Sequence, residues 1–419
     1  MASQVTCEHR LNVRWLGCDG DANTGKDDES EVNVAATVHF LTVNLLFENY
    51  LHSLKIQSNG MSTYLVPDQN TCHQPTSITG ENQIPTEEEQ AYKKLDEKLK
   101  SLLATLPKDK GWRSANIYLH EGFWLSPQVI KGLLMINNYF HAQSTDIFLA
   151  AFMKCGTTWL KALMFATTNR HRYSFSDHPL RRNGPQSAFP FLDTHIFLDY
   201  PITKFEHLPS PRMFATHFAH SLLPTSMSSP TSTCKFVYVC RDPKDALISK
   251  WHFMSKLRSK ELPPLSFNEA YELFCNGVSE YGPFWDHVLG YWKASQESPE
   301  KILFLKYEDM KKETSVELKK LAAFMGMPFS AEEEKRGVVA EIVKLCSFEN
   351  LSNLEVNNEG GGAQKFTAQV AVENRDFFRK GKVGDWKNYL TEEMRERIDS
   401  ITETKFKNSG LTLGLTKEA

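Results

Sequence analysis

DIFLAAFMKCGTTWLK, the sequence of residues 146–161, joins an apolar run, a turn with one glycine and the start of a helical pattern. A strand, a tight turn and a helix in this order point free backbone N–H groups at an anion. Gly156 allows close approach of the backbone, Thr157 and Thr158 add hydroxyl groups, and Lys154 adds a positive charge. The stretch therefore predicts an anion-binding loop at the end of a buried strand.

The position of the lysine separates this loop from a Walker A motif. That motif reads GxxxxGK[ST], with the lysine after the glycine and a hydroxyl group for magnesium, whereas Lys154 precedes Gly156. The order fits a phosphosulfate group, which needs no bridging metal. We therefore expect no metal site and disfavour a P-loop nucleotide kinase. For this stretch taken alone, a surface loop with an incidental lysine stays an alternative.

Further apolar runs predict more strands of the same sheet. They lie at 213–216, 235–240 and 302–305, and longer helical patterns cover 87–106, 266–280 and 314–325. Short apolar runs that alternate with helices are typical of a parallel sheet buried between helices. Such sheets bind ligands at the carboxyl ends of their strands. The predicted fold class is α/β, with a central parallel sheet flanked by helices.

A second candidate site follows the 235–240 run, where residues 241–249 read RDPKDALIS. Asp242 is a good N-cap and Pro243 suits the first helical position. Arg241 is therefore expected at the carboxyl end of the strand, with Ser249 about two turns down the helix. Arginine suits bidentate contacts with phosphate. A helix cap with a surface Arg–Asp pair is the alternative.

A third candidate site is the segment FFRKGKVGDW at residues 377–386. Its two aromatic residues, the cations Arg379 and Lys380, and Gly381 can form an anion-binding turn with a stacking surface. A solvated basic loop is the alternative.

Composition limits the class of protein. The 419 residues carry a net charge of −3 and a pI near 6.5, so no overall positive field attracts nucleic acid. Eight cysteines without metal-type spacing indicate reduced thiols. The N-terminus lacks a signal-peptide core, and the apolar stretch 38–51 is interrupted by polar residues and shorter than the about 20 residues that span a bilayer. We expect a cytoplasmic protein without a membrane partner.

Residues 1–85 differ from the rest of the chain. They contain the acidic patch Asp27-Asp28-Glu29-Ser30-Glu31 and a polar run over 68–83, and only 38–51 is apolar enough for a helix or strand. We predict a partly disordered extension here and a folded domain over 86–419.

The three candidate sites, in this order, resemble those of the cytosolic (soluble) sulfotransferase family. Its phosphosulfate loop reads Pro-Lys-Ser/Thr-Gly-Thr-Thr-Trp, its 3′-phosphate site Arg-Asp/Asn-Pro with a serine eight residues after the arginine, and its late motif Arg-Lys-Gly-x-x-Gly-Asp-Trp. Two shorter family motifs match Thr216-His217 and Tyr307-Glu308-Asp309. The stretches 118–124, 281–285 and 346–351 are similar to the plant branch.

The resemblance implies a single P-loop-like α/β domain that uses 3′-phosphoadenosine 5′-phosphosulfate (PAPS) as sulfuryl donor. It implies that the 5′-phosphosulfate is held by Lys154, Cys155, Gly156, Thr157 and Thr158. It places the 3′-phosphate at Arg241, Ser249, Arg379, Lys380 and Gly381, and the adenine at Trp159, Tyr307 and Phe348.

Sulfuryl transfer requires a base, because the acceptor hydroxyl must lose its proton as the new bond forms. A histidine is the natural base, and His217 follows a predicted strand between two phosphate sites. Lys154 can stabilise the charge on the leaving oxygen, and in the family the serine matching Ser249 interacts with that lysine. The acceptor is expected to be a small hydroxyl compound, such as a flavonoid, a steroid or a jasmonate-like acid. Candidates for its apolar pocket are Phe189, Phe191 and Phe253, with plain core aromatics as the alternative.

Several residues depart from the family pattern. Met153 replaces a proline and Cys155 a serine or threonine, so we expect weaker cofactor binding. A catalytically impaired relative that binds PAPS or its desulfated product PAP is therefore the alternative function. Phe218-Ala219 replaces Leu-Pro, which predicts a reshaped acceptor pocket, and Cys346 stands beside the expected adenine. The dimer motif of animal members departs at Glu392, which predicts a monomer or a weak homodimer.

Overall fold

The computed structural model describes residues 87–193, 205, 208, 210–229, 231–358, 362–365 and 371–413. All of them belong to one of the two units of the chain, Thr63–Ala419. The predicted extension, including its 38–51 segment, lies outside the described residues.

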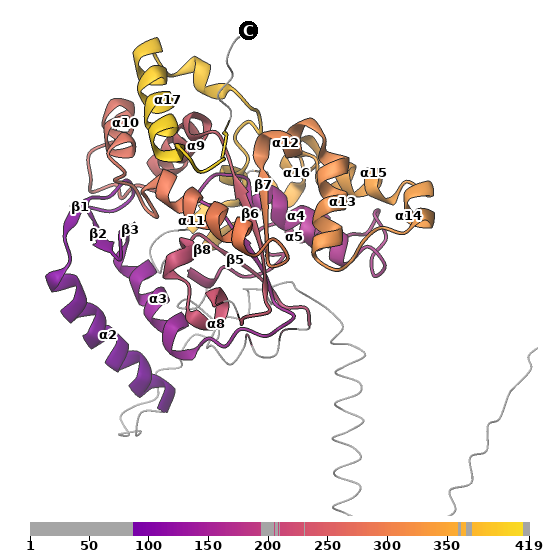
Figure 1. Cartoon of the computed structure of the whole chain (residues 1–419), viewed down its shortest axis with the longest axis horizontal. Coiled ribbons are helices and arrows are strands. Elements are labelled where there is room, and N and C mark those ends of the chain that lie inside the picture. The colour runs from indigo at the N-terminus through magenta and orange to yellow at the C-terminus, as the bar shows by residue number, and fades with distance from the viewer. Residues whose placement is uncertain are drawn as a thin grey trace, which may run out of the picture. The chain divides into compact units, whose positions relative to one another are not determined.

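A four-stranded parallel sheet forms the centre of this unit (Figure 1). Its strands are, in spatial order, β5 (Met213–Thr216), β4 (Ile147–Ala150), β6 (Lys235–Cys240) and β7 (Ile302–Lys306). Every residue of β4 and β5 is buried, so helices and loops cover both faces of the sheet. The α/β fold class and the parallel sheet are confirmed, and each predicted strand lies within its apolar run, except that β7 extends one residue further, to Lys306.

Aromatic rings align the three strands on one side of the sheet. Phe148 of β4 stacks on Phe214 of β5, with ring centroids 5.5 Å apart, and on Phe236 of β6 at 4.9 Å. Ring pairs of this kind contribute about 0.5–1.5 kcal/mol beyond the area they bury. A slip of one residue would turn these rings to the opposite face, so the register is strongly specified.

Helices and short turns surround the sheet (Figure 1). The longer helices are α4 (Thr157–Thr168), α9 (Pro243–Leu257), α10 (Phe267–Cys275), α11 (Phe284–Glu297), α13 (Thr314–Phe324), α15 (Val338–Leu345) and α17 (Glu392–Phe406). The short ones are α5 (Leu180–Asn183), α8 (Thr225–Ser228), α12 (Tyr307–Lys312), α14 (Ala331–Lys335) and α16 (Phe348–Ser352). Single 3₁₀ turns are η1 (His220–Leu222), η2 (Glu355–Asn357), η3 (Asn374–Phe377) and η4 (Asp385–Asn388), and a small hairpin pairs β8 (Ala363–Lys365) with β9 (Ala371–Glu373).

A separate layer precedes the sheet in the chain. It consists of α2 (Glu87–Thr105), the antiparallel strands β1 (Lys108–Lys110), β2 (Asn116–His120) and β3 (Phe123–Leu125), and α3 (Pro127–Tyr139). Trp112, between β1 and β2, is fully buried and donates its indole N–H to the carbonyl of Val278 at 3.0 Å. This bond joins the β1–β2 loop to the segment before α11.

The predicted helix over 266–280 is wrong at its end. Ser266 caps α10 at the start, and the helix stops at Cys275 because Gly277 adopts a φ of +81°, a left-handed conformation that ends helices. The helices predicted over 87–106 and 314–325 are confirmed.

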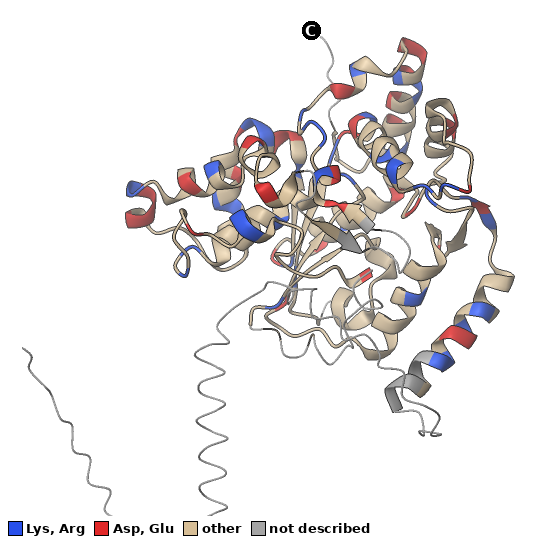
Figure 2. Ribbon diagram, turned by 180° about the vertical axis from the view of Figure 1, so that it is seen from behind, with Lys and Arg blue, Asp and Glu red and all other residues tan. Residues whose placement is uncertain are grey.

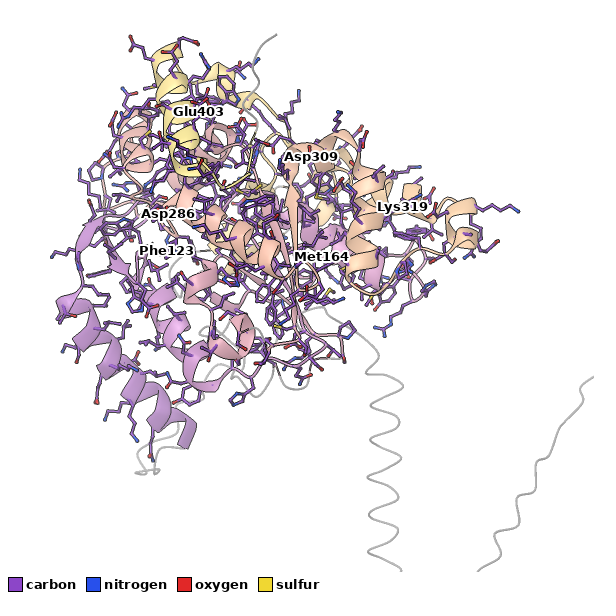
Figure 3. All side chains as sticks on the ribbon, in the orientation of Figure 1. Phe123, Met164, Asp286, Asp309, Lys319 and Glu403 are labelled. Atoms are coloured by element: carbon purple, nitrogen blue, oxygen red, sulfur yellow. The ribbon has the colours of Figure 1, made fainter. Side chains whose placement is uncertain are left out.

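Positions with Lys, Arg, Asp or Glu lie mostly on the surrounding helices and loops, with both signs intermixed (Figure 2). Met164 of α4 is buried beside the sheet, whereas Lys319 of α13 and Glu403 of α17 are exposed on the outer helices (Figure 3). Among the described helices, none combines the length and the apolar character that a membrane span requires.

Candidate active site

A large cavity lies where the four strands end. Its walls include residues one to four positions after each strand: Met153 and Lys154 after β4, His217 after β5, Arg241 after β6 and Tyr307 after β7. The other walls come from α4, α9, α16 and the loop after η3. The structure thus brings the three candidate sites and His217 to one cavity. Every predicted cofactor residue lines it except Cys155.

The first loop closes tightly against an aromatic side chain. Gly156 caps α4 with a φ of +119°, and a Cβ atom at this position would lie 2.9 Å from the Tyr307 ring. Only glycine fits both the conformation and the space. The first N–H groups of α4 face the cavity without intrahelical partners, and the buried hydroxyl of Thr157 has no hydrogen-bond partner among the described residues.

Lys154 extends over two aromatic rings. Its Nζ lies 3.9 Å from the ring centroid of Phe253 and 5.7 Å from that of Phe377. Burial, assisted by the nearby charges of Arg241 and Arg379, lowers the pKa of Lys154 to about 7. Phe253 lies one helical turn after Ser249 on α9, and both line the cavity. The lysine therefore rests on the same face of α9 that presents Ser249.

Cys155 faces the core instead of the cavity. Its side chain is fully buried, its Sγ lies 4.0 Å from the carbonyl of Met153, and its N–H donates to the carbonyl of Phe152. Burial raises the pKa of the thiol to about 12. The side chain and the amide are thus both engaged within the protein, and the argument for weaker cofactor binding through a lost hydroxyl contact does not apply to this position.

Arg241 connects the first and third candidate sites. Its Nη1 donates to the carbonyl of Lys154 at 3.4 Å, and its Nη2 donates to the carbonyl of Lys382 at 2.8 Å. The guanidinium lies 4.7 Å from the Tyr307 ring centroid and 3.5 Å from Asp245. Its buried Nε has no partner among the described residues, which leaves one charged donor for a ligand.

Two aspartates hold the late loop in place. Asp245 of α9 accepts the N–H groups of Gly384 and Trp386 at 2.7 and 3.1 Å. Asp385 lies 2.6 Å from Arg379 and accepts from Lys380 at 2.7 Å. These contacts fix the loop backbone against α9 and keep the two cations at the cavity.

The adenine residues predicted from the resemblance form two aromatic contacts. Trp159 packs edge-on against Tyr307, with centroids 5.6 Å apart, and Phe348 packs edge-on against Phe378 at 6.1 Å. Gly381 has a φ of +61°, and a Cβ atom there would lie 2.4 Å from the Phe348 ring. Glycine is therefore required where the late loop passes Phe348, as it is at Gly156 beside Tyr307.

Within the described part of the chain, one ring nitrogen of His217 is hydrogen-bonded and the other has no partner. Its Nδ1 lies 2.7 Å from the carbonyl oxygen of Ala151. A carbonyl only accepts, so Nδ1 carries the proton and Nε2 keeps its lone pair. Burial lowers the pKa of this histidine to about 4, which keeps the ring neutral near pH 7. The rings of Phe191 and Tyr281 lie 5.0 and 5.4 Å away and restrict its orientation.

Two buried residues that the sequence did not single out hold the backbone of His217. Asp193 accepts the His217 N–H at 3.1 Å and the Tyr281 hydroxyl at 2.7 Å. His287 donates from Nε2 to the His217 carbonyl at 2.9 Å and accepts from the Tyr238 hydroxyl at 2.9 Å. Tyr281 lies in a stretch already noted for its resemblance to the plant branch, whereas Asp193 and His287 carried no local signal.

The aromatic candidates for the acceptor pocket divide into two groups. Phe191 and Phe253 line the cavity. Phe189 is fully buried away from it, and Phe218 and Ala219 are also buried outside its walls. The prediction that Phe189 lines the pocket is therefore wrong. Phe218 packs edge-on against Tyr281 of the cavity wall, with centroids 6.3 Å apart, so the effect of Phe218-Ala219 on the pocket stays a prediction. Cys346 does line the cavity, beside Phe348.

Buried donors without partners match a phosphorylated nucleotide. Thr157 Oγ1, Arg241 Nε and Arg379 Nε are buried and unpaired within the described part of the chain, and a buried polar group without a partner is costly. Aromatic rings lie beside these donors. In the same part of the chain, no group of three or more His, Cys, Asp and Glu residues is arranged to hold a metal ion. The fold and cavity thus define an α/β protein with a site for an aromatic ligand that carries several anionic groups.

Comparisons with known proteins agree with this description. The sulfotransferase domain family matches residues 144–410. Cytosolic sulfotransferase 12 of Arabidopsis thaliana is 46% identical over 320 residues, which cover 76% of this chain and 94% of the relative. Cytosolic sulfotransferase 15 of the same plant is 41% identical over 319 residues, 75% of this chain and 87% of the relative. These names agree with the predicted cytoplasmic location.

Solved structures show the same fold. An Arabidopsis thaliana protein described as a candidate steroid sulphotransferase is 40% identical, with a TM-score of 0.60 and coverage of 77% of this chain and 97% of that one. Mouse sulfotransferase SULT7A1 in complex with PAP is 27% identical, with a TM-score of 0.53 and coverage of 70% and 95%. The chain belongs to the sulfotransferase family. It is a PAPS-dependent sulfotransferase, which transfers a sulfuryl group to a small-molecule acceptor.

Proposed function

We propose that this chain sulfates a hydroxyl group of a small organic acceptor, with His217 as the base and Lys154 as the group that stabilises the leaving oxygen. The observation that carries the proposal is the free Nε2 of His217 in the same cavity as Lys154 and the unpaired donors of Arg241 and Arg379. When bound, PAPS supplies the activated sulfuryl group, and the protein supplies position, charge and a proton acceptor.

The proton leaves the acceptor through Nε2. Because Nδ1–H is held by the Ala151 carbonyl, the ring is fixed in the tautomer that accepts a proton at Nε2. The same bond stabilises the imidazolium that forms. Asp193 and His287 hold the His217 backbone from both sides, so the ring needs little reorganisation.

The donor nucleotide is held at two ends in this proposal. Lys154, Gly156, Thr157 and Thr158 would bind the 5′-phosphosulfate, through the lysine, the hydroxyls and the first N–H groups of α4. Arg241, Ser249, Arg379, Lys380 and Gly381 would bind the 3′-phosphate. Trp159, Tyr307 and Phe348 would enclose the adenine. Lys154 lies over the ring of Phe253, and Ser249 on the same face of α9 would offer the lysine a polar partner.

The acceptor is expected beside His217, between Phe191, Phe253 and Tyr281, which line the cavity. These rings fit a flat or ring-shaped acceptor, and the sulphotransferase described as a candidate for steroids shares the fold. The fold alone does not determine which acceptor is used. The acceptor has to be inferred from the side chains of the cavity wall.

The function is tested by incubating the protein with PAPS carrying labelled sulfur and a panel of phenols, sterols and hydroxy acids. We expect labelled product with at least one class, and tight PAP binding by calorimetry. Tight PAP binding without transfer to any class would contradict the proposal and favour the catalytically impaired relative. The intact Lys154, His217 and Ser249 in one cavity favour transfer.

The pH dependence of transfer is expected to have two limbs. His217 must be neutral, so kcat/KM for PAPS should fall as pH drops toward its pKa of about 4. Lys154 must be charged, so kcat/KM should fall as pH rises through its pKa of about 7 in the free protein. The measurement is kcat/KM for PAPS from pH 4 to 10 with an alcohol acceptor that does not ionise in this range.

A substitution near Lys154 identifies the upper limb. Lys256 lowers the pKa of Lys154, while Asp376, with which it pairs at 2.5 Å, raises it. Lys256→Met should therefore move the upper limb to higher pH and leave the lower limb unchanged. An upper limb at the same pH in both proteins would mean that a group other than Lys154 sets it.

A further inference from the structure

The loop between β1 and β2 is held rigidly at the edge of the cavity. The N–H groups of Trp112 and Arg113 donate to Glu280 Oε1 at 2.9 and 3.1 Å. The carbonyl of Arg113 accepts the N–H of Ser259 at 3.1 Å. Arg258 donates to the carbonyls of Gly111 and Trp112 at 3.0 and 2.7 Å. The backbone that carries the Arg113 side chain is therefore fixed from two directions.

The Arg113 side chain lines the cavity without a partner among the described residues. It belongs to the cavity wall and is half-buried. Within the described residues, its only hydrogen bonds are the two made by its backbone, and its guanidinium forms no ion pair. Arginine carries five donors in a planar fork that matches a carboxylate. A fixed backbone with a free guanidinium is the arrangement of a ligand-binding arginine.

Arg113 lies on the acceptor side of the cavity. Its charge acts on the Tyr281 hydroxyl, where it opposes the effect of burial, which raises the pKa of Tyr281. The Tyr281 ring in turn packs against His217 with centroids 5.4 Å apart. After Arg113, the next residues of the sequence that line the cavity are Ser126, Gln128 and Val129, at the start of α3. Arg113 and the proposed base thus line the same cavity, and Arg113 lies on a part of the wall that the residues proposed for the nucleotide do not use.

The neighbouring charges are already balanced by each other. Glu280 accepts two backbone N–H groups and lies 3.7 Å from the buried ammonium of Lys250, whose Nζ also donates to the Glu280 carbonyl. Lys256 pairs with Asp376 at 2.5 Å. Unlike Glu280, Lys250 and Lys256, Arg113 forms no ion pair with a described residue.

We propose that Arg113 binds a carboxylate on the acceptor, so that the preferred acceptors are hydroxy acids whose hydroxyl reaches His217 while the carboxylate reaches Arg113. This inference rests on the proposed function of the same cavity and adds the substrate class. Ser126 and Gln128 provide further polar atoms for the anionic group, and the rings of Phe191, Phe253 and Tyr281 contact the apolar part between the two ends.

The test compares acids with their neutral esters. The probes are 4-hydroxyphenylacetic, 3-(4-hydroxyphenyl)propanoic and 4-(4-hydroxyphenyl)butanoic acids and their methyl esters, which vary the distance between hydroxyl and carboxylate. We expect the wild-type protein to favour at least one acid over its ester by about 10- to 100-fold in kcat/KM, the range of one charge-assisted contact. The difference should lie mainly in KM.

Variants separate this contact from a general effect. Arg113→Gln should remove the preference by raising KM for the acid, with kinetic constants for the ester and PAP affinity nearly unchanged. Arg113→Lys should keep part of the preference, because it keeps the charge without the planar fork. Lys256→Met, which removes a paired cation nearby, should keep the acid-to-ester ratio.

The same probes are also measured by calorimetric binding to the protein saturated with PAP, which needs no transfer. Equal binding and equal transfer of acid and ester would overturn the carboxylate site and leave sulfuryl transfer intact. An acid preference that persists in Arg113→Gln would overturn the role of Arg113. A third outcome is that no probe is sulfated, but the acid binds more tightly than its ester and this difference disappears in Arg113→Gln. That outcome would support the carboxylate site and contradict only the proposed sulfuryl transfer.

Discussion

His217→Ala is expected to lower kcat by about 10²–10⁴-fold and to change the dissociation constant for PAP by less than about twofold. The loss is expected because no other described side chain offers a free nitrogen at this position next to Lys154 and Phe191. PAP affinity is preserved because the ring contacts Ala151, Phe191 and Tyr281, and none of these is proposed to touch the nucleotide. Steady-state kinetics and calorimetry with PAP measure the two quantities.

His220→Ala is the matched control. His220 lies three residues later in η1, packs against Tyr291 with centroids 5.3 Å apart, and is outside the cavity wall. Like His217, it has a pKa lowered by burial, so the control removes a similar imidazole without the proposed function. Normal turnover in His217→Ala, or an equal loss in both variants, would show that His217 is not the base.

The sheet was predictable from the sequence because its strands are short, continuous apolar runs. Runs of this kind, separated by helical patterns, leave little choice but a buried parallel sheet. The antiparallel layer of β1, β2 and β3 was missed for the opposite reason. Every residue of β1, Lys108–Lys110, is polar and exposed, and β3 has three residues. These segments are strands because they pair with one another, and their sequences show no apolar pattern that would reveal it.

The start of α3 could have been predicted from the local sequence. Ser126 accepts the N–H of Val129 and Pro127 follows it, the cap and first helical residue that sequence rules describe. The overlong helix at 266–280 shows the reverse error, because its stop depends on the conformation of one glycine. Boundaries set by a single φ angle are harder to predict than the element itself.

The candidate site, too, has a part that the sequence predicts and a part that it does not. The loops at Lys154, Arg241 and Arg379 carry motifs, so their meeting in one cavity could be expected from the ends of parallel strands. The residues that hold His217 come from far along the chain, 24 positions for Asp193 and 70 for His287. No spacing rule connects such residues. Cys155 was assigned by its place in a motif, but the turn directs its side chain to the core.

Arg241→Ala is expected to raise the dissociation constant for PAP by about 10- to 100-fold, the effect of losing a charge-assisted phosphate contact. The affinity for AMP, which lacks the 3′-phosphate, should fall much less. The ratio of the two affinities is the informative quantity, because Arg241 also holds the loops through the carbonyls of Lys154 and Lys382. A change in loop position weakens both nucleotides, whereas loss of the phosphate contact weakens PAP alone.

Lys382→Ala is the control for charge in the same loop. Its side chain is exposed, and only its carbonyl accepts from Arg241, so the variant removes a positive charge and keeps that hydrogen bond. We expect PAP and AMP affinities close to those of the wild type, with thermal unfolding measured for all variants. If Arg241→Ala weakens PAP and AMP binding equally, the arginine supports the loops and does not contact the 3′-phosphate. The unpaired Nε would then be left for a ligand group other than the 3′-phosphate. If only the affinity for PAP falls, Arg241 at the end of β6 contacts the 3′-phosphate. This contact would then distinguish PAPS from nucleotides that lack a 3′-phosphate.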